Sequence, residues 1–148
     1  MKDICIAAMT PATLPAAAGL ALALWPDNEL VSLEEEFTEL MNDPSAALLL
    51  ALAGQEAVGF AHCQLRRDYV EGTDSSPVGY LEGIYVLPAW RGRGIAAKLL
   101  RRCEDWARQQ GCREFASDCE LHNIDSLAFH LRLGFEEANR IICFRKAL

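Results

Sequence analysis

Apolar and polar residues follow two different spacings along this chain. Where an apolar residue recurs at every third or fourth position, with charged residues opposite, the pattern predicts an amphipathic helix. The clearest example covers residues 95–110, and Gly111 is a suitable stop after it. The same spacing predicts helices over residues 12–24, 31–41 and 123–133, the last of them ended by Gly134.

Shorter stretches rich in aliphatic and aromatic residues predict strands. They cover residues 2–8, 47–53, 56–66, 114–118 and 141–146, and a further strand begins at Pro77 and ends near Val86. Gly54 and Gln55 separate the second strand from the third and predict a hairpin. Because strands alternate with helices, we expect an α/β (α+β) fold with helices around one sheet. No repeat or linker interrupts the pattern, so residues 1–148 are expected to form a single domain.

The apolar run at residues 12–24 raises the alternative of a secretion signal. Only Lys2 is basic before it, Asp3 offsets that charge, and Pro15 lies inside the run. Thr10 and Pro11 are typical of a helix start. We therefore expect a helix here and a cytoplasmic protein. The composition, 51% hydrophobic and 24% charged, is that of a globular chain, and no stretch is long and apolar enough to predict a membrane span.

The net charge of −7 is unevenly distributed along the chain. Between Asp3 and Leu65 there are nine acidic residues and no Lys or Arg, whereas from Arg66 onward 13 basic residues accompany 12 acidic ones. An acidic first part would attract a cation and disfavours nucleic acid as a partner. The alternative for Glu34 to Glu39 alone is a solvated helix face.

The six cysteines do not predict a metal site. No two of them are spaced as C-x-x-C, and Cys119 with His122 is the nearest approach to a ligand pair. We expect reduced thiols, several of them in the core, and no metal.

The segment from Val86 to Ala96 has the chemistry of an anion site. A strand ends, a turn with two glycines and two arginines follows, and a helix begins. Glycines allow the backbone to approach a ligand closely, and the unpaired N–H groups of a first helical turn favour an anion such as a pyrophosphate. A capped helix with a tight entry turn is the structural alternative.

The same segment resembles the acyl-CoA signature of the GNAT acetyltransferases, Arg/Gln-x-x-Gly-x-Gly/Ala, with Arg91, Gly94 and Ala96 at its fixed positions. A second block, from Asn123 through Ser126, Phe129 and His130 to Gly134-Phe135, is similar to the C-terminal GNAT motif. The resemblance implies the GNAT fold, with a central mixed, mostly antiparallel sheet, and acetyl-CoA as co-substrate. The residues that it implies for acetyl-CoA are Ile84, Tyr85, Val86, Arg91, Gly92, Arg93, Gly94, Ile95, Ala96, Ala97 and Asn123, the last on the pantetheine arm.

Several further stretches, among them residues 25–26, 67–70, 74–78, 81–84 and 111–118, resemble the bacterial chromosomal aminoglycoside 6'-N-acetyltransferases. This resemblance covers nearly the whole chain. It implies acetylation of the 6'-amine of kanamycin- or tobramycin-type drugs, resistance to them, and a homodimer in which the last strand pairs across subunits. The acceptor pocket that it implies consists of Trp25, Asn28, Tyr69, Glu82, Asp118 and Asn139. Relatives can carry other residues at positions 28 and 139.

Glu82 is the strongest catalytic candidate from the residues themselves. It interrupts the apolar strand that ends near Val86, where a carboxylate is costly unless it is paired or functional. We expect Glu82 to act as general base, directly or through water, and Asp118 to position the ammonium group. The structural alternative is an ion pair of Glu82 with Arg113 or another arginine.

His130 stands where the GNAT motif usually has a tyrosine that protonates the departing thiolate. A histidine can also donate a proton, so we expect His130 to be the general acid, with a purely structural role as the alternative. A backbone N–H near Val86 would polarise the carbonyl. No cysteine stands beside a candidate base, so transfer is expected to be direct rather than through an acyl-cysteine.

Two other functions remain compatible with these motifs. A GNAT enzyme that acetylates a polyamine or a protein amine would share every acetyl-CoA residue and differ only in its acceptor pocket. A regulatory acyl-CoA-binding module without turnover would need neither Glu82, Asp118 nor His130.

Overall fold

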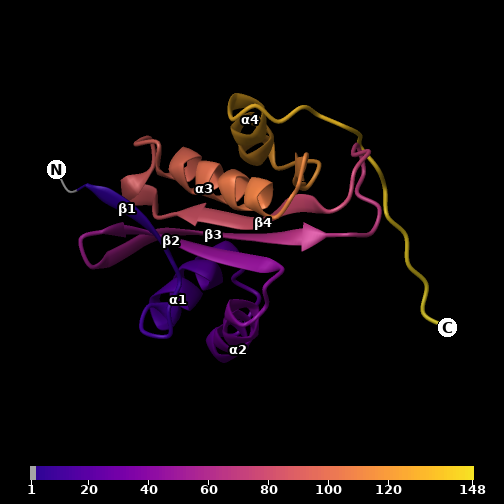
Figure 1. Ribbon diagram of the computed structural model, residues 1–148. Coiled ribbons are helices and arrows are strands. Elements are labelled where there is room, and N and C mark those ends of the chain that lie inside the picture. The colour runs from indigo at the N-terminus through magenta and orange to yellow at the C-terminus, as the bar shows by residue number, and fades with distance from the viewer. Residues whose placement is uncertain (1–2) are drawn as a thin grey trace.

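The computed structural model describes residues 3–148, arranged as one five-stranded sheet between two layers of helices (Figure 1). The strands are β1 (Ile4–Ala8), β2 (Ala46–Ala53), β3 (Glu56–Arg66), β4 (Val78–Val86) and β5 (Phe115–Ala116). The helices are α1 (Leu14–Leu24), α2 (Leu30–Met41), α3 (Ile95–Gln109) and α4 (Ile124–Arg132), with the short 3-10 helix η1 (Pro88–Trp90) before α3.

The sheet has the strand order β1-β2-β3-β4-β5. All neighbours are antiparallel except β4 and β5, which are parallel and joined through α3. Helices α1 and α2 cover one face and α3 and α4 the other (Figure 1). The expected mixed, mostly antiparallel sheet flanked by helices is therefore confirmed.

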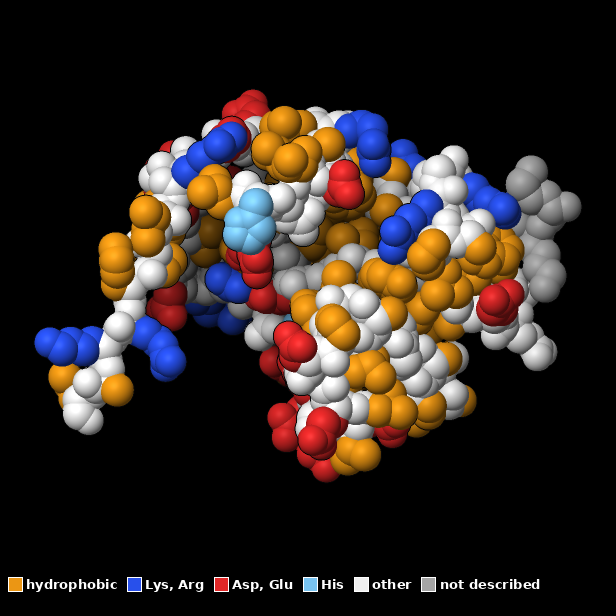
Figure 2. Space-filling model, turned by 180° about the vertical axis from the view of Figure 1, so that it is seen from behind, with side chains coloured by type: hydrophobic (Ala, Val, Ile, Leu, Met, Phe, Trp, Pro, Cys, Tyr) orange, Lys and Arg blue, Asp and Glu red, His pale blue; other side chains and the backbone are white. Residues whose placement is uncertain are grey.

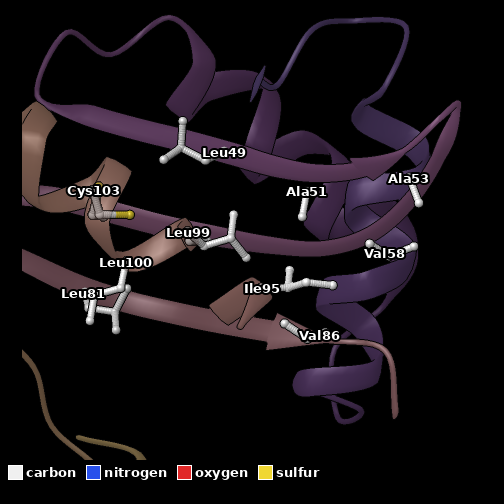
Figure 3. Packing of buried hydrophobic residues seen from close by; sticks show 12 residues of the cluster. Leu49, Ala51, Ala53, Val58, Leu81, Val86, Ile95, Leu99, Leu100 and Cys103 are labelled. Atoms are coloured by element: carbon white, nitrogen blue, oxygen red, sulfur yellow. The ribbon is translucent and has the colours of Figure 1, made fainter. Parts of the chain in front are cut away.

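The core on the α3 side joins that helix to three strands. Leu99 and Cys103 are fully buried, and Figure 3 shows the apolar face of α3 directed at side chains of β2, β3 and β4. This is the stripe that the three-to-four-residue spacing predicted. The core on the other side uses small residues of α1, because Ala17, Ala18 and Ala21 are fully buried against the sheet. Since helices cover both faces, β2 and the first half of β3 after Glu56 are apolar without alternation, whereas His62, Gln64 and Arg66 alternate with apolar residues in the second half of β3.

Two expected boundaries need correction. Helix α1 begins at Leu14 rather than after Thr10-Pro11, with Thr13 as its N-cap and Pro15 in the first turn, where a missing N–H costs nothing. The strand expected at residues 114–118 shortens to β5, because only Phe115 and Ala116 pair with β4. Lys2, which opened the first expected strand, lies outside the described residues.

The strand expected at residues 141–146 is wrong for this single chain. The segment has no regular structure, and Ile141, Ile142 and Phe144 are 64%, 79% and 89% exposed. The segment runs away from the body of the molecule (Figure 1), so it meets no strand with which it could pair. Among residues 3–148, no helix has the length and apolar character needed to cross a membrane.

Candidate active site

Glu82 occupies a β-bulge in the middle of β4. Leu81 pairs with Cys63 and Gly83 pairs with His62, so Glu82 is the extra residue that β3 leaves without a partner. A bulge changes the direction of a side chain and bends the strand locally. The carboxylate lies on the same sheet face as Tyr80, since Arg66 contacts both.

Arg66, the last residue of β3, holds this carboxylate. Its Nε and Nη2 donate to Oε1 of Glu82 at 3.0 and 2.8 Å, and Nη2 also donates to Oε2 at 2.9 Å. The same guanidinium lies 3.4 Å from the centre of the Tyr80 ring. The ion pair considered as an alternative for Glu82 is therefore present, with Arg66 rather than Arg113. The pair is partly open to solvent, because the Glu82 side chain is 25% exposed.

Tyr80 connects this pair to the second carboxylate. Its hydroxyl donates a hydrogen bond to Asp118. Burial, and then the bond to Asp118, raises the pKa of Tyr80, so the phenol stays protonated and remains a donor. The structure thus joins Glu82 and Asp118 through Arg66 and Tyr80, two residues that sequence reasoning missed.

Next to Asp118, the sheet opens. Strands β4 and β5 pair only at Gly79 and Tyr80, so the rest of β4, through Val86, has no strand on that side. The carbonyl of Val86 accepts from Nε of Arg91 at 2.8 Å. This unpaired stretch of β4 contains the expected acetyl-CoA residues Ile84, Tyr85 and Val86.

The aromatic ring of Trp25 packs against β4 at Gly83, the residue after Glu82. It follows α1, and a side chain at Gly83 would come within 2.5 Å of its ring, so glycine is what allows the indole to lie against β4. Phe60 supports the ring edge-on, with centroids 5.9 Å apart. Asn28 donates to the Trp25 carbonyl at 3.3 Å. The structure thus places the Trp25 ring at Gly83, the residue after Glu82, and Asn28 at the Trp25 carbonyl.

The other expected acceptor residues, Tyr69 and Asn139, meet at a carboxylate. Tyr69 follows β3 and is 79% exposed, and its hydroxyl donates to Glu71 at 3.0 Å. Asn139 donates from Nδ2 to the other oxygen of Glu71 at 2.9 Å. Glu71 is a third residue that sequence reasoning missed, although it directly follows the motif at residues 67–70.

The turn before α3 has the conformation expected for an anion site. Gly92 and Gly94 have φ of +77° and +76°, which L side chains rarely adopt. The first intrahelical acceptor is the carbonyl of Gly94, which accepts from Lys98, so the preceding amides lack an in-helix partner. Arg93 lies 4.7 Å above the Trp90 ring. An open backbone turn with free amides and two arginines fits the phosphates of acetyl-CoA.

Comparison with known proteins agrees with this geometry. Residues 15–135 match the Acetyltransferase (GNAT) family. The chain is 47% identical to an aminoglycoside N(6')-acetyltransferase type 1 of Stenotrophomonas maltophilia, over 94% of this chain and 90% of the relative. It is 43% identical to the Salmonella typhimurium protein of that name, over 86% and 88%. The chain belongs to the GNAT acetyltransferase family.

Two solved structures show how far this GNAT chain resembles aminoglycoside acetyltransferases. AAC(6')-Iy, in complex with the bisubstrate analogue CoA-S-monomethyl-acetylneamine, has a TM-score of 0.95 and 40% identity, covering 99% of both chains. AAC(6')-Ih from Acinetobacter baumannii has a TM-score of 0.94 and 40% identity, again over 99% of both. The GNAT fold is thereby confirmed over 99% of the chain.

His130, the departure from the GNAT tyrosine, is held by two hydrogen bonds. Its Nδ1 donates to the carbonyl of Ser126 at 2.7 Å, because a carbonyl can only accept, and a neutral ring then leaves Nε2 to accept from the Ser117 hydroxyl at 2.8 Å. Ser117 also lies 3.4 Å from the Leu81 carbonyl, where β4 and β5 separate. Phe135 packs against the ring, with centroids 5.0 Å apart. His130 therefore reaches the opening through Ser117, a fourth residue that the sequence did not indicate.

Asn123, the residue expected on the pantetheine arm, stands at the start of α4. Asn123 caps α4, since its Oδ1 accepts from the Ser126 amide at 3.1 Å. That bond leaves the Nδ2 group of Asn123 for the expected contact with pantetheine.

Cys63, Cys103 and Cys112 are buried free thiols, as expected of core residues. Contact with Cys103 and burial raise the pKa of Cys63, which disfavours the thiolate that an acyl-cysteine would need.

Proposed function

We propose that this chain transfers the acetyl group of acetyl-CoA to the 6'-amine of kanamycin- and tobramycin-type aminoglycosides, and so confers resistance to them. The observation that carries this proposal is the position of Glu82, at a bulge in the length of β4 that β5 leaves unpaired and next to Gly83, where the Trp25 ring lies. A carboxylate and an aromatic face are what a hydroxyl-rich polycation needs for binding. The names of the relatives, at 40% to 47% identity, point to the same acceptor.

The donor substrate would lie along the unpaired stretch of β4. Residues 91–97 would bind its phosphates through backbone amides and the two arginines. Residues 84–86 would pair with the pantetheine arm, and Asn123 would contact it from α4. A backbone N–H near Val86 would polarise the thioester carbonyl.

Glu82 would act as the base in direct transfer. The acceptor ammonium loses a first proton, its nitrogen attacks the thioester carbonyl carbon, the nitrogen then loses a second proton, and the carbon–sulfur bond breaks. Glu82 would take the first proton directly or through one water, and the second is balanced by the proton that the departing sulfur gains. Asp118, oriented by the Tyr80 hydroxyl, would hold the amine. Arg66, which donates to both oxygens of Glu82, would hold the carboxylate in position during these steps.

His130 would return a proton to the departing sulfur through the Ser117 hydroxyl. In the neutral ring, Nδ1 carries the hydrogen and Nε2 accepts from Ser117. Protonation of Nε2 by the second proton that the attacking nitrogen loses would reverse that second bond, so that His130 donates to Ser117 and Ser117 donates to the thiolate. The GNAT tyrosine would need no such relay.

We also propose a cytoplasmic homodimer. A second copy would cover the exposed residues Ile141, Ile142 and Phe144, which the chain itself leaves in water. The three exposed free thiols, on Cys5, Cys119 and Cys143, suit a reducing compartment. Light scattering would test the dimer: Ile142→Ser/Phe144→Ser should give a monomer where the unaltered chain gives a dimer, and two equal masses would contradict the proposal.

Release of free CoA thiol would test the activity. Purified protein with acetyl-CoA should release thiol with kanamycin far faster than with spermidine or a peptide amine, and cells that express the chain should gain kanamycin resistance. Faster release with spermidine or the peptide would favour another GNAT acceptor. Acetyl-CoA binding without any release would leave a non-catalytic module.

A further inference from the structure

We infer that Glu71 is a specificity-determining residue, which binds a second ammonium group of the acceptor, away from the amine that reacts. This inference rests on the proposed aminoglycoside function. Its basis is the arrangement of Glu71, Tyr69 and Asn139, which we call the Glu71 subsite.

Glu71 is oriented by neutral donors only. The Tyr69 hydroxyl donates to Oε2 at 3.0 Å and the Asn139 amide to Oε1 at 2.9 Å. These bonds, that from Asn139 first, lower the pKa of Glu71, so the group is a carboxylate at neutral pH. Both oxygens keep accepting capacity, since an ionised carboxylate has about four lone-pair sites.

The negative charge of Glu71 is also uncompensated. Within residues 3–148, the ion pairs join Arg66 to Glu82, Arg108 to Asp105, His122 to Glu120 and Arg140 to Glu137. Glu82 is thus already paired with an arginine, whereas Glu71 faces a phenol and an amide. A polycation with one ammonium group at Glu82 would find at Glu71 a charge that no protein cation occupies.

The Glu71 subsite is attached to the catalytic carboxylates through a buried contact. Val70, the neighbour of Glu71, packs with Val78 and Tyr80, and the Tyr80 hydroxyl donates to Asp118. Glu114 fixes the far side of the same loop by accepting from the Asp74 amide at 2.9 Å. The loop therefore places Glu71 at a defined position relative to Asp118, as recognition of a second ammonium group requires.

Asn139 is the neutral hydrogen-bond partner to which the charge of Glu71 could be moved. At position 139, where relatives can carry other residues, this chain has an amide that donates to Glu71 and brings no charge of its own. A carboxylate at position 139 would lie within hydrogen-bond distance of the place where Glu71 holds its charge. Transfer of the charge from one partner to the other should therefore preserve the subsite.

The test compares kanamycin kinetics of four proteins at low salt. Glu71→Gln removes the charge, Glu71→Gln/Asn139→Asp moves it across the hydrogen bond, and Glu56→Gln is the matched control, at the other end of β3. We expect Glu71→Gln to raise KM for kanamycin about fivefold, the upper range for an exposed ion pair, with KM for acetyl-CoA unchanged. The double variant should recover most of that loss. Glu56→Gln removes one of the nine acids of residues 3–65 without touching the subsite, and should raise KM for kanamycin far less than Glu71→Gln.

Each other outcome has a distinct meaning. If the unaltered protein acetylates kanamycin and Glu71→Gln behaves like Glu56→Gln, the subsite is wrong and the proposed function stands. If Glu71→Gln impairs kcat and the KM values of both substrates, and the double variant restores nothing, Glu71 only ties the loop to the C-terminal segment, and the inference is overturned. If the unaltered protein acetylates no aminoglycoside, the proposed function itself fails.

Discussion

Glu82 shows how one residue can satisfy a structural and a chemical demand together. A carboxylate within a sheet is costly when it is unpaired, and Arg66 removes that cost with bonds of 2.8 to 3.0 Å. The bulge at the same position keeps the carboxylate partly exposed, so a substrate amine can reach it. An ion pair and a catalytic role are therefore compatible at Glu82.

Glu82→Gln should test that role, because it keeps the shape and removes the charge. We expect turnover to fall about 100-fold or more, the usual scale for loss of a general base, while acetyl-CoA affinity stays near its original value. Steady-state kinetics between pH 6 and 9, with calorimetry of acetyl-CoA binding, would measure both. Unchanged activity across that range would remove Glu82 from the mechanism.

His62 should make the stability depend on pH. The residue is 6% exposed, and desolvation lowers its pKa below the usual value of 6.5. As pH falls below 6.5, His62 binds a proton in the unfolded chain but not in the folded chain. The free energy of unfolding should therefore decrease until the pH reaches the folded-state pKa of His62. Denaturant unfolding of His62→Gln at pH 7.5 and 5.5 should show a smaller loss than the unaltered protein. Equal losses in the two proteins would show that His62 does not cause this dependence.

At the scale of elements, the turn into α3 combines a backbone requirement with the proposed phosphate site. Gly94 has φ +76° and opens on free space, since an added Cβ would meet no atom within 4 Å. Gly111, after the other end of α3, has φ +89° and is equally open. The two glycines therefore carry the same backbone strain when substituted, but only Gly94 lies at the end where amides are free.

Because Gly94 and Gly111 have similar conformations and surroundings, they give a matched pair of variants. Gly94→Val and Gly111→Val should each lower the free energy of unfolding by about 1–3 kcal/mol, the cost of a side chain in a left-handed conformation. Gly94→Val should in addition weaken acetyl-CoA binding by far more than its loss of stability, whereas Gly111→Val should bind normally. Calorimetry on the folded variants would decide, and unchanged affinity in Gly94→Val would show that the turn binds no phosphate.

At the scale of the whole molecule, charge is arranged in two parts. Seen from behind, the molecule is hollowed between the α1 and α2 layer and the α3 and α4 layer, and acidic side chains gather over α2 (Figure 2). Residues 3–65 carry nine acids and no Lys or Arg. A field of this sign attracts a polycationic acceptor but gives no help to an anionic donor.

The salt dependence of the two substrates should therefore differ. We expect kcat/KM for kanamycin to fall as salt rises, since the Debye length is about 8 Å at physiological ionic strength. Asp118→Asn should reduce that fall, because it removes one of the attracting charges. Acetyl-CoA should show no benefit from the acidic part. If salt leaves kcat/KM for kanamycin unchanged, the acceptor is not recognised as a cation.

Local patterns in the sequence were enough to predict the elements and several site residues. Helix α3 and strand β3 follow from periodicity, the turn at Gly92 and Gly94 follows from composition, and Glu82 stands out as an acid in an apolar strand. Each of these signals lies within about a dozen consecutive residues. Propensity and spacing act over that range, so the sequence by itself determined them.

Only the tertiary structure decided the partners of those residues. Arg66 is 16 positions from Glu82, Tyr80 is 38 from Asp118, and Asn139 is 68 from Glu71. Such pairs depend on strand register, and a shift of one residue would turn every side chain of a strand to the other face. The strand expected at residues 141–146 is absent for the same reason, because a strand forms only beside the edge of another strand, and this segment runs away from the sheet (Figure 1).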